Sequence, residues 1–348
     1  MKMKDIKNTN ERIEDIVKED IIEENPQLTN KKESQLIQYF DKINICEINP
    51  IRVANEREEL SFVKGFDIIV EEVNDYLIKL ANKGIEWRLL RQKVIDYFNN
   101  YDINLKEIYN WLLNNQNDSN SIFLLGYLFF FEIGANFDVK KAFNLFLNAS
   151  EKDHTFSQYF VGSCYKYGNG TKKNLKLAFE YFEKSANKNF SYGQVEIGYI
   201  YKHGINSIIK DSKKAFYWYE KATNNGNMIA MNTLGLYYKD GIDVKKDYDK
   251  AFKLFKKSAE EGYPNGINSL GCCYEIGVGT KIDMQKAFEL YQKSANLGNM
   301  GGQYNLAMMY ENGKGITKDI DKAIYWYEKS AKQGDKNAQY ELEKLKNQ

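Results

Sequence analysis

Residue types that could carry out catalysis or bind a metal are sparse in this chain and are poorly spaced for either task. Only two histidines, His154 and His203, occur in 348 residues, and neither has a second histidine or cysteine at the spacing of a zinc site. The glycine-rich stretches beginning at Gly168 and Gly277, GNGTK and GVGTK, lack the preceding strand and the full spacing of a phosphate-binding loop. No Ser-His-Asp or Cys-His arrangement is supported beyond the presence of the residue types. The sequence therefore predicts no catalytic residue, no metal and no cofactor.

The elements that would position any functional side chain come from an internal repeat. Six alanines recur at intervals of 36, 37, 36, 36 and 36 residues, namely Ala142, Ala178, Ala215, Ala251, Ala287 and Ala323. A constant period of this length is typical of a solenoid, in which each repeat packs against its neighbours.

Each repeated alanine lies in a predicted helix whose two ends are marked. Four residues before it stands a residue type that caps helix starts: Asp138, Asn174, Asp211, Asp247, Asp283 or Asp319. Eleven residues after it stands a type that tolerates the left-handed conformation ending a helix: Asp153, Asn189, Gly226, Gly262, Gly298 or Gly334. Apolar residues follow the alanine at helical spacing, so we expect a helix of about four turns, called helix B, in every repeat.

A second helix, called helix A, precedes helix B and contains a small residue at a fixed place. These residues are Gly126, Gly162, Gly198, Gly235, Gly271 and, in the last copy, Ala307. A glycine inside a helix costs about 1 kcal/mol relative to alanine, so we expect the missing Cβ to permit close approach of a neighbouring helix. Another small residue lies five positions earlier and indicates a second tight contact: Ser121, Ser157, Gly193, Ala230, Gly266 and Gly302.

These features resemble a known family. The pattern small-x-x-x-Leu-Gly-x-x-Tyr, then Gly-x-Gly, then Lys-Asp-x-x-Lys-Ala-x-x-Trp-Tyr-x-Lys-Ser-Ala-x-x-Gly is similar to the Sel-one-like repeat (SLR) family, a branch of the tetratricopeptide-type helical arrays. The sixth copy, from Gln303 to Gly334, fits nearly every position except Ala307. The resemblance covers about Asn120 to Gly334. It implies an all-α fold, a right-handed α-solenoid superhelix of antiparallel helical hairpins with about six 36-residue repeats and helical caps at both ends.

The expected domain organisation has four parts. Residues 1–58 are charged and rich in asparagine, and they are predicted to be disordered or partly helical. Residues 59–118 form a helical N-terminal cap, with one helix ending at Gly84, a second over 86–100 and a third begun by Asn104 and Glu107. The six repeats occupy 119–154, 155–190, 191–227, 228–263, 264–299 and 300–335. Residues 336–348 form a C-terminal capping helix with a charged outer face.

Repeat 1 departs from the common spacing. Its turn glycine, Gly134, follows Gly126 by eight residues instead of six, whereas Gly126 and Ala142 keep their separation of 16. Either helix A is longer in this repeat or Leu128 takes the glycine position. The stretch FLLGYLFFFEIG is the most apolar of the chain, and we interpret it as core packed under the N-terminal cap.

The resemblance also implies which residues meet a partner. In this family helix A lines the concave face of the superhelix. The candidates are the helix A residues that correspond, when the repeats are aligned on Gly162, to the groove-facing positions of tetratricopeptide-type repeats. They are Tyr159, Ser163, Lys166, Tyr167, Val195, Tyr199, Lys202, His203, Asn232, Leu236, Lys239, Asn268, Glu275, Tyr304, Met308 and Glu311, with Asp240 and Cys272 in the same phase. The alternative is that they are merely solvated helix ends.

One position of this set changes sign along the array. The residues at this position are Lys166, Lys202, Lys239, Glu275 and Glu311 in repeats 2 to 6. If repeat 1 is aligned on its turn glycine, the equivalent residue there is Glu132. We expect the three lysines to face solvent and to form a basic strip that attracts an acidic segment. Tyr159, Tyr167 and Tyr199 would then supply most of the affinity.

The net charge, the absence of long apolar stretches and the cysteine pattern limit the binding partners and cellular locations that we expect. A net charge of +1 gives no global attraction to nucleic acid or to an anionic membrane. The N-terminus has no apolar signal core, and no stretch reaches the roughly 18 apolar residues of a membrane span. The four cysteines, Cys46, Cys164, Cys272 and Cys273, do not recur with the period, so we expect thiols in a reducing compartment. A cytoplasmic location is expected, with the nucleus as the alternative.

The predicted function is a non-enzymatic scaffold or adaptor in a signalling or stress pathway, binding a protein partner with an acidic segment through the concave face and no small-molecule substrate. One alternative is a regulatory or docking subunit of a protein kinase supplied in trans, because similar helices precede the array in fungal-type members of the family. The chain itself has no Gly-rich phosphate loop, HRD-type catalytic loop or DFG triplet. The second alternative, a hydrolase of the kind claimed for cysteine-rich bacterial relatives, is disfavoured by the cysteine pattern.

Overall fold

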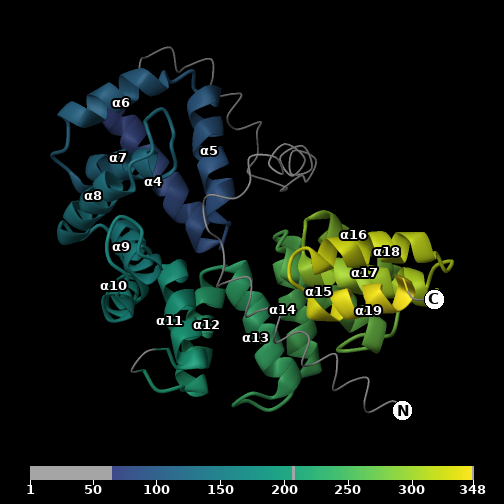
Figure 1. The fold of residues 1–348 in the computed structure, drawn as a ribbon. Coiled ribbons are helices and arrows are strands. Elements are labelled where there is room, and N and C mark those ends of the chain that lie inside the picture. The colour runs from purple at the N-terminus through teal and green to yellow at the C-terminus, as the bar shows by residue number, and fades with distance from the viewer. Residues whose placement is uncertain (1–64, 206–207, 347–348) are drawn as a thin grey trace, which may run out of the picture. The chain divides into compact units, whose positions relative to one another are not determined.

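The computed structural model describes residues 65–205 and 208–346, and every regular element in these ranges is a helix. The first ten helices are α4 (Phe66–Asn82), α5 (Trp87–Asn100), α6 (Leu105–Asn114), α7 (Ser119–Phe130), α8 (Val139–Glu151), α9 (Thr155–Tyr167), α10 (Leu175–Asn187), α11 (Ser191–His203), α12 (Ser212–Asn224) and α13 (Met228–Asp240). The other six are α14 (Tyr248–Glu260), α15 (Pro264–Ile276), α16 (Met284–Asn296), α17 (Met300–Asn312), α18 (Ile320–Ala331) and α19 (Lys336–Lys346). The all-α class predicted from the sequence is confirmed (Figure 1). The expectation for residues 1–58 lies outside the described residues.

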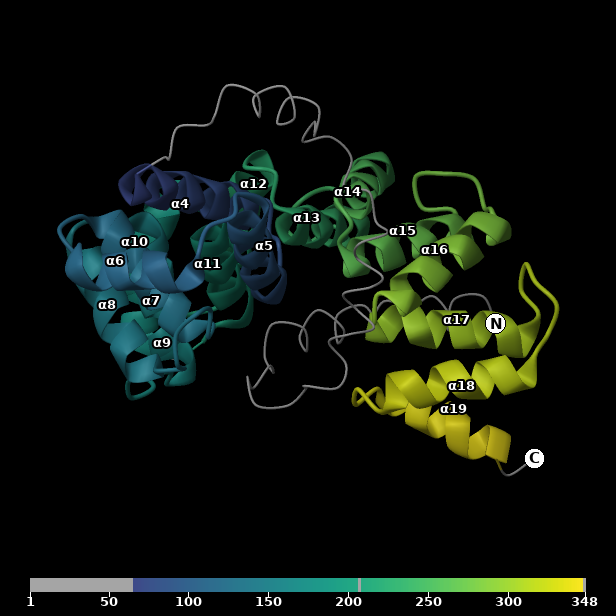
Figure 2. The same ribbon diagram turned by 90° about the horizontal axis from the view of Figure 1, so that it is seen from above.

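The helices form two compact units, divided between Lys246 and Asp247. The N-terminal unit contains α4 to α13, and the C-terminal unit contains α14 to α19. Within each unit the two helices of a hairpin pack together, and each hairpin packs on the next, as α8 does on α9 and α16 on α17. Figure 2 shows α17, α18 and α19 side by side. The core therefore extends along each unit, as expected for a solenoid.

The predicted starts and ends of helix B are confirmed in all six repeats. Each of the six predicted N-cap side chains accepts a hydrogen bond from the backbone N–H three residues later, at distances of 2.8 to 3.1 Å. Each of the six predicted end residues has a positive φ, between 64° and 104°. Residue types within one turn of each end are therefore enough to delimit these helices.

The glycines of helix A lie where the structure has no room for a side chain. A Cβ on Gly162 would stand 2.7 Å from Phe182, and one on Gly271 would stand 2.7 Å from Tyr291, each on helix B of the same repeat. The earlier small residue makes the second predicted contact, because a Cβ on Gly302 would lie 2.8 Å from the Cβ of Ser294 in the preceding repeat. Both close approaches predicted from the sequence are confirmed.

Repeat 1 follows neither of the two predicted alternatives. Its helix A, α7, has 12 residues and is not longer than α9, which has 13. Gly126 keeps the glycine position, since a Cβ there would lie 3.0 Å from Phe146 of α8. Glu132, six residues after Gly126, adopts the left-handed conformation that Gly168 adopts six residues after Gly162, with φ of 54° and 80°. Gly134 therefore corresponds to Gly170, the second glycine of the turn in repeat 2, and the turn contains no insertion.

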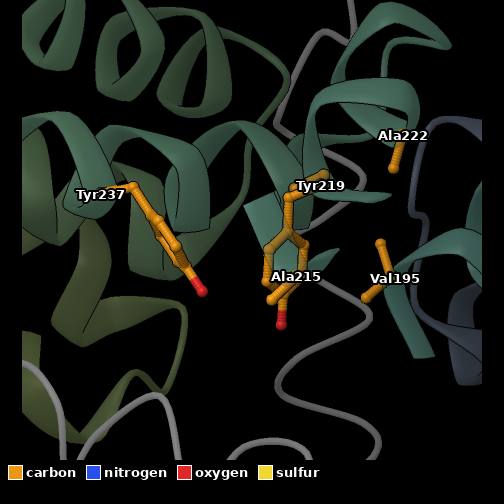
Figure 3. Close-up of a cluster of buried hydrophobic side chains, with 6 residues drawn as sticks. Val195, Ala215, Tyr219, Ala222 and Tyr237 are labelled. Carbon is orange, nitrogen blue, oxygen red and sulfur yellow. The ribbon is translucent and has the colours of Figure 1, made fainter. Parts of the chain in front are cut away.

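The core of each hairpin is built from aromatic residues and the repeated alanines. In repeats 3 and 4, Ala215, Tyr219 and Tyr237 are buried together with Val195 (Figure 3). The two tyrosine rings have centroids 6.0 Å apart. The apolar stretch of repeat 1 is core as predicted, since residues 122–129 are all buried.

The three expected N-terminal helices are confirmed as α4, α5 and α6. Gly84 has a φ of 81° just after α4, and the Asn104 side chain accepts from the N–H groups of Lys106 and Glu107 at the start of α6. Helix α4 contacts α7 and α11 as well as α5. It therefore lies against helix A of repeats 1 and 3, and the N-terminal cap is part of the side of the array as well as its end.

Candidate partner-binding surface

The sixteen predicted partner-binding residues fall into two groups by exposure. Seven are buried and cannot meet a partner in this structure: Val195, Tyr199, Asn232, Leu236, Lys239, Asn268 and Tyr304. Nine are half-buried or exposed: Tyr159, Ser163, Lys166, Tyr167, Lys202, His203, Glu275, Met308 and Glu311. These nine come from α9 and α11 in the N-terminal unit and from α15 and α17 in the C-terminal unit, whereas every candidate on α13 is buried.

Lys166 of α9 is paired with an acidic residue that the sequence analysis did not identify. Its Nζ lies 2.9 Å from Glu196 Oε2 of α11, and the two side chains are only 15% and 13% exposed. The ammonium also lies over the rings of Tyr167, at 5.0 Å, and Tyr199, at 5.6 Å. Burial alone would lower the pKa of Lys166, but the Glu196 carboxylate outweighs it and raises that pKa above its ordinary value. The charge of Lys166 is therefore already neutralised within the N-terminal unit.

Lys239 of α13 also departs from expectation. It is 7% exposed, and its Nζ lies 3.5 Å from Asp240 Oδ1. The prediction that Lys166, Lys202 and Lys239 all face solvent is therefore wrong for Lys239, because the α13 helix turns this side chain into the protein. A solvent-facing strip of three lysines does not form in the N-terminal unit.

The two glutamates at the same repeat position accept hydrogen bonds from buried tyrosines. In repeat 5, Tyr291 Oη donates to Glu275 Oε2 at 2.7 Å, and Lys314 lies 3.3 Å from the other carboxylate oxygen. In repeat 6, Tyr327 Oη donates to Glu311 at 2.7 Å. Burial, and then the hydrogen bond to Glu311, raise the pKa of Tyr327. These glutamates satisfy core hydroxyl groups.

The residue type on helix B four positions after the repeated alanine accounts for the two glutamates at this position. Where the helix A residue is Lys166 or Lys239, the aromatic residue four positions after the repeated alanine is phenylalanine, Phe182 or Phe255. Where it is Glu275, that residue is Tyr291, which needs an acceptor. Repeat 3 is the exception, with Lys202 and a tyrosine. Packing needs therefore account for the two glutamates without a partner protein.

The three cysteines in the described part of the chain are buried and form no disulfide there. Burial raises the pKa of the Cys164 thiol to about 12. Cys272 Sγ accepts a hydrogen bond from Tyr291 Oη at 3.2 Å, beside Asn268, which accepts from Asn305 at 3.0 Å. The expectation for Cys46 lies outside the described residues.

A hydrogen bond that sequence reasoning missed links the N-terminal cap to repeat 3. Asn82, the last residue of α4, accepts from the Ser191 N–H at 2.9 Å through Oδ1, and its carbonyl accepts from Ser191 Oγ at 2.8 Å. The next residue, Lys83, accepts from the Met228 N–H at 3.0 Å. The last residue of α4 and the residue after it therefore accept hydrogen bonds from the first N–H groups of both α11 and α13.

A recurrent surface arrangement was also missed. In repeats 3, 5 and 6 the N-cap aspartate of helix B pairs with the lysine three residues later, and that lysine lies over a tyrosine of helix A. In repeat 1 the equivalent Lys141 lies over Phe129 instead. In repeat 5 the distances are 3.2 Å between Lys286 and Asp283 and 5.3 Å between Lys286 and the ring of Tyr274. Repeat 2 lacks the arrangement, because Asn174 and Leu177 replace the charged pair.

Within residues 65–205 and 208–346 no group of histidine, cysteine, aspartate and glutamate side chains could hold a metal ion. In the same ranges, no helix combines the length and the apolar character needed to cross a bilayer.

The described residues thus define an α-solenoid of helical hairpins with aromatic cores, and comparison with known proteins gives its family. The Sel1 repeat matches six times, at residues 119–154, 155–190, 191–227, 229–263, 264–299 and 301–335. The chain belongs to the Sel1 repeat family. Proteins with such repeats are generally protein–protein interaction scaffolds and are typically non-catalytic.

Two solved structures illustrate the similarity. A Sel1 repeat protein from Oxalobacter formigenes is 28% identical with a TM-score of 0.62, and the match covers 69% of this chain and 96% of that protein. The protective antigen c5321 of uropathogenic Escherichia coli, which displays an SLR fold, is 29% identical with a TM-score of 0.57. That match covers 69% of this chain and 50% of the antigen. No curated protein matches the chain.

Proposed function

We propose that this protein is a non-enzymatic scaffold that binds another protein through helix A residues of its repeats. The observation that carries the proposal is the sixfold Sel1 repeat, since such arrays generally act as interaction scaffolds. Among the candidates, Tyr167, which is 46% exposed, and the half-buried Lys202 and Met308 keep accessible surface. An adaptor role in a signalling or stress pathway and a cytoplasmic or nuclear location belong to the proposal. The buried thiols support such a reducing compartment.

The test is affinity purification of the tagged full-length chain from its native cell, with mass spectrometry of the proteins that co-purify. The variant combines Tyr167→Ala with Lys202→Glu. Its control combines Tyr325→Ala with Lys329→Glu on α18, where another exposed tyrosine carries a lysine 4.6 Å from its ring. We expect the control to keep the partner and the variant to retain about a tenth of it or less.

Two outcomes would contradict the proposal in different ways. If no protein co-purifies reproducibly with the parent chain, the scaffold function is wrong. If a variant with an unchanged circular dichroism spectrum keeps the partner at the parental level, the assignment to helix A residues is wrong.

A regulatory or docking subunit of a protein kinase supplied in trans is the second candidate. The observation that favours it is the ordered packing of α4 on α7 and α11, in a segment whose sequence resembles the one preceding the array in kinase-associated relatives. The same purification tests it, because a kinase should appear among the captured proteins. If the eluate contains no kinase activity, this candidate function is contradicted.

A hydrolase is not proposed, although one serine and one histidine lie together. His154 Nδ1 is 2.9 Å from Ser157 Oγ, but both residues are buried. His154 Nδ1 also accepts from the Ser157 N–H at 3.1 Å, which makes the ring the N-cap of α9. This pair serves the helix start and faces no substrate.

A further inference from the structure

The turns between helix A and helix B carry a set of lysines along one edge of the N-terminal unit. We call this set, together with the lysines at the second residue of the following helix B, the basic edge: Lys140, Lys172, Lys173, Lys176, Lys210, Lys213, Lys245 and Lys246. All eight are exposed, and no ion pair in the described part of the chain involves any of them. Their charges are therefore available to a partner, unlike that of Lys166.

The turns that carry these lysines adjoin one another. A Cβ on Gly170, in the turn of repeat 2, would lie 2.8 Å from the carbonyl carbon of Val139 at the start of α8 in repeat 1. In repeat 3, Ile205 and Ile208 pack on the core around Ala178, and Ile242 of repeat 4 packs on the core around Ala215. Each turn thus lies against the start of helix B in the preceding repeat, which makes the basic edge continuous over repeats 1 to 4.

The positive charge of this edge is concentrated at repeat 2. From Gly168 to Phe179 the sequence has three lysines and no aspartate or glutamate, and the N-cap is the neutral Asn174. At this level repeat 3 has one carboxylate, Asp211, which Lys214 engages at 3.8 Å, whereas repeat 1 has Glu132 and Asp138, and repeat 4 has Asp243 close in sequence to Lys245.

The equivalent edge of the C-terminal unit is better neutralised. Lys286 and Lys322 lie 3.2 and 3.0 Å from their N-cap aspartates. A nearby Asp319 carboxylate raises the pKa of Lys322 through their hydrogen bond. Lys281 and Lys318 are exposed on the turns of this unit as well, but an aspartate follows each of them within two residues. The excess of positive charge is therefore greatest at repeat 2, which has no carboxylate at this level.

We propose that the basic edge is a docking surface for an extended acidic segment of a partner protein. Neighbouring repeats are about 10 Å apart, which an extended chain spans in about three residues, so acidic residues at every third position would match the lysine clusters. Phe137, 52% exposed beside Lys140, offers an apolar contact within the same edge. This inference rests on the proposed scaffold function. It specifies an acidic partner segment and adds a second binding surface to the helix A residues proposed above.

The carboxylates on the edge favour a protein over a uniformly charged polymer. Asp138, Asp211 and Asp243 interrupt the lysines in repeats 1, 3 and 4. An RNA strand or an anionic bilayer would place negative charge against these carboxylates, whereas a protein segment can place a neutral or basic residue there.

The test uses the full-length chain and fluorescence anisotropy with a labelled peptide of about 15 residues repeating Glu-Ser-Leu, long enough to cross four repeats. The charge-reversal variant is Lys172→Glu with Lys173→Glu and Lys176→Glu. Its control, Lys253→Glu with Lys257→Glu and Lys281→Glu, makes the same change on exposed lysines of the C-terminal unit. We expect the Kd to rise about tenfold or more in the first variant and less than about twofold in the control.

A single substitution tests the same surface with less risk to folding. Asn174→Asp adds one negative charge at the centre of the basic edge, and aspartate already caps helix B in the other five repeats. We expect the melting temperature to be unchanged and the Kd for the peptide to rise about twofold to threefold.

Several results would overturn this inference. They are an absence of peptide binding at low salt, equal losses in the variant and its control, or tighter binding of a single-stranded RNA of similar length or of phosphatidylserine vesicles. In the purification from native cells, loss of the partner from the Tyr167→Ala, Lys202→Glu variant but not from the repeat 2 variant would also overturn it, while leaving the scaffold function standing. Absence of any partner would instead overturn the scaffold function.

Discussion

At the scale of single residues, polar side chains that look like surface contacts in the sequence are used inside the array. Lys166 is paired with Glu196, and Glu275 accepts from Tyr291. A buried hydroxyl without an acceptor costs about 1–3 kcal/mol, so in repeats 5 and 6 the glutamate serves the tyrosine that helix B supplies. The negative charge at this position in these two repeats follows from the hydrogen-bonding needs of the core.

A double-mutant cycle at this position separates core stabilisation from partner binding. Glu275→Ala should reduce the free energy of unfolding by about 1–3 kcal/mol, because Tyr291 keeps only the weak acceptor Cys272 Sγ. Tyr291→Phe removes the need for an acceptor, and phenylalanine occurs at the equivalent place as Phe182. The double variant should therefore lose less than the sum of the single losses in urea unfolding. A purely surface role for Glu275 predicts no loss in the single variant.

A second residue-scale prediction concerns pH. Burial, and then the charge of Lys188, lower the pKa of His154 to about 4, below the unfolded value of about 6.5. The unfolded chain therefore binds a proton between pH 6.5 and 4 while the folded chain does not, so stability falls as the pH drops through this window. The full loss is on the order of 3 kcal/mol below pH 4, and none is present above pH 6.5.

The matched variant is His154→Asn, because Asn227 and Asn299 cap the helix A starts of repeats 4 and 6. We expect it to unfold like the parent at pH 7 and to be more stable than the parent at pH 5, as measured by thermal unfolding. Equal destabilisation of both proteins between pH 7 and 5 would show that His154 does not contribute.

At the scale of elements, helix A starts are satisfied in three ways. His154 and Asn227 cap their own helices, and α15 has Pro264 at its first position, which has no N–H to satisfy. Helix α11 has Phe190 at the N-cap and no side-chain cap of its own. Asn82 of α4 takes over this role from outside the repeat.

Removing this cap should weaken repeat 3 specifically. Asn82→Ala is expected to cost about 1 kcal/mol, and the Ser191 amide should exchange its hydrogen faster. Asn100→Ala, at the exposed end of α5, serves as the control and should change neither quantity. An unchanged exchange rate at Ser191 in the Asn82 variant would contradict the capping role.

At the scale of the whole molecule, a solenoid needs closed ends because every repeat buries its faces only against neighbours. In the C-terminal unit, α19 supplies Ala338, Leu342 and Leu345 to the core around Tyr327. The glycine position of this last helix A is Glu343, which is exposed. We interpret α19 as the cap of the array.

Deletion of residues 336–348 should therefore expose the apolar face of repeat 6. The loss of burial is about 2 kcal/mol or more and should lower the melting temperature by about 4 °C or more, or cause aggregation. The control is Tyr340→Ser, since this α19 side chain is 65% exposed and its loss should change stability by less than about 0.5 kcal/mol. A deletion variant that melts like the parent would rule out the capping role.

The sequence by itself determined the repeat, the helix boundaries and the family, because these depend on residues close together in the chain. An N-cap such as Asp283 and a helix end such as Gly298 act within one turn of the helix they delimit, so their types are sufficient signals. The glycines of helix A could be interpreted as close contacts for the same reason, since their effect recurs with the period.

Only the tertiary structure decided which polar residues remain available to a partner. The bond between Lys166 and Glu196 joins residues 30 positions apart, and the bond between Ser191 and Asn82 joins residues 109 positions apart. Such pairs arise from how the hairpins stack and where α4 lies on them, and neither is encoded in a local pattern. The same stacking aligns the turn lysines of successive repeats, because each turn packs on the preceding helix B. Periodic local signals thus specify the array, while contacts between distant segments decide which of its polar side chains remain accessible to a partner.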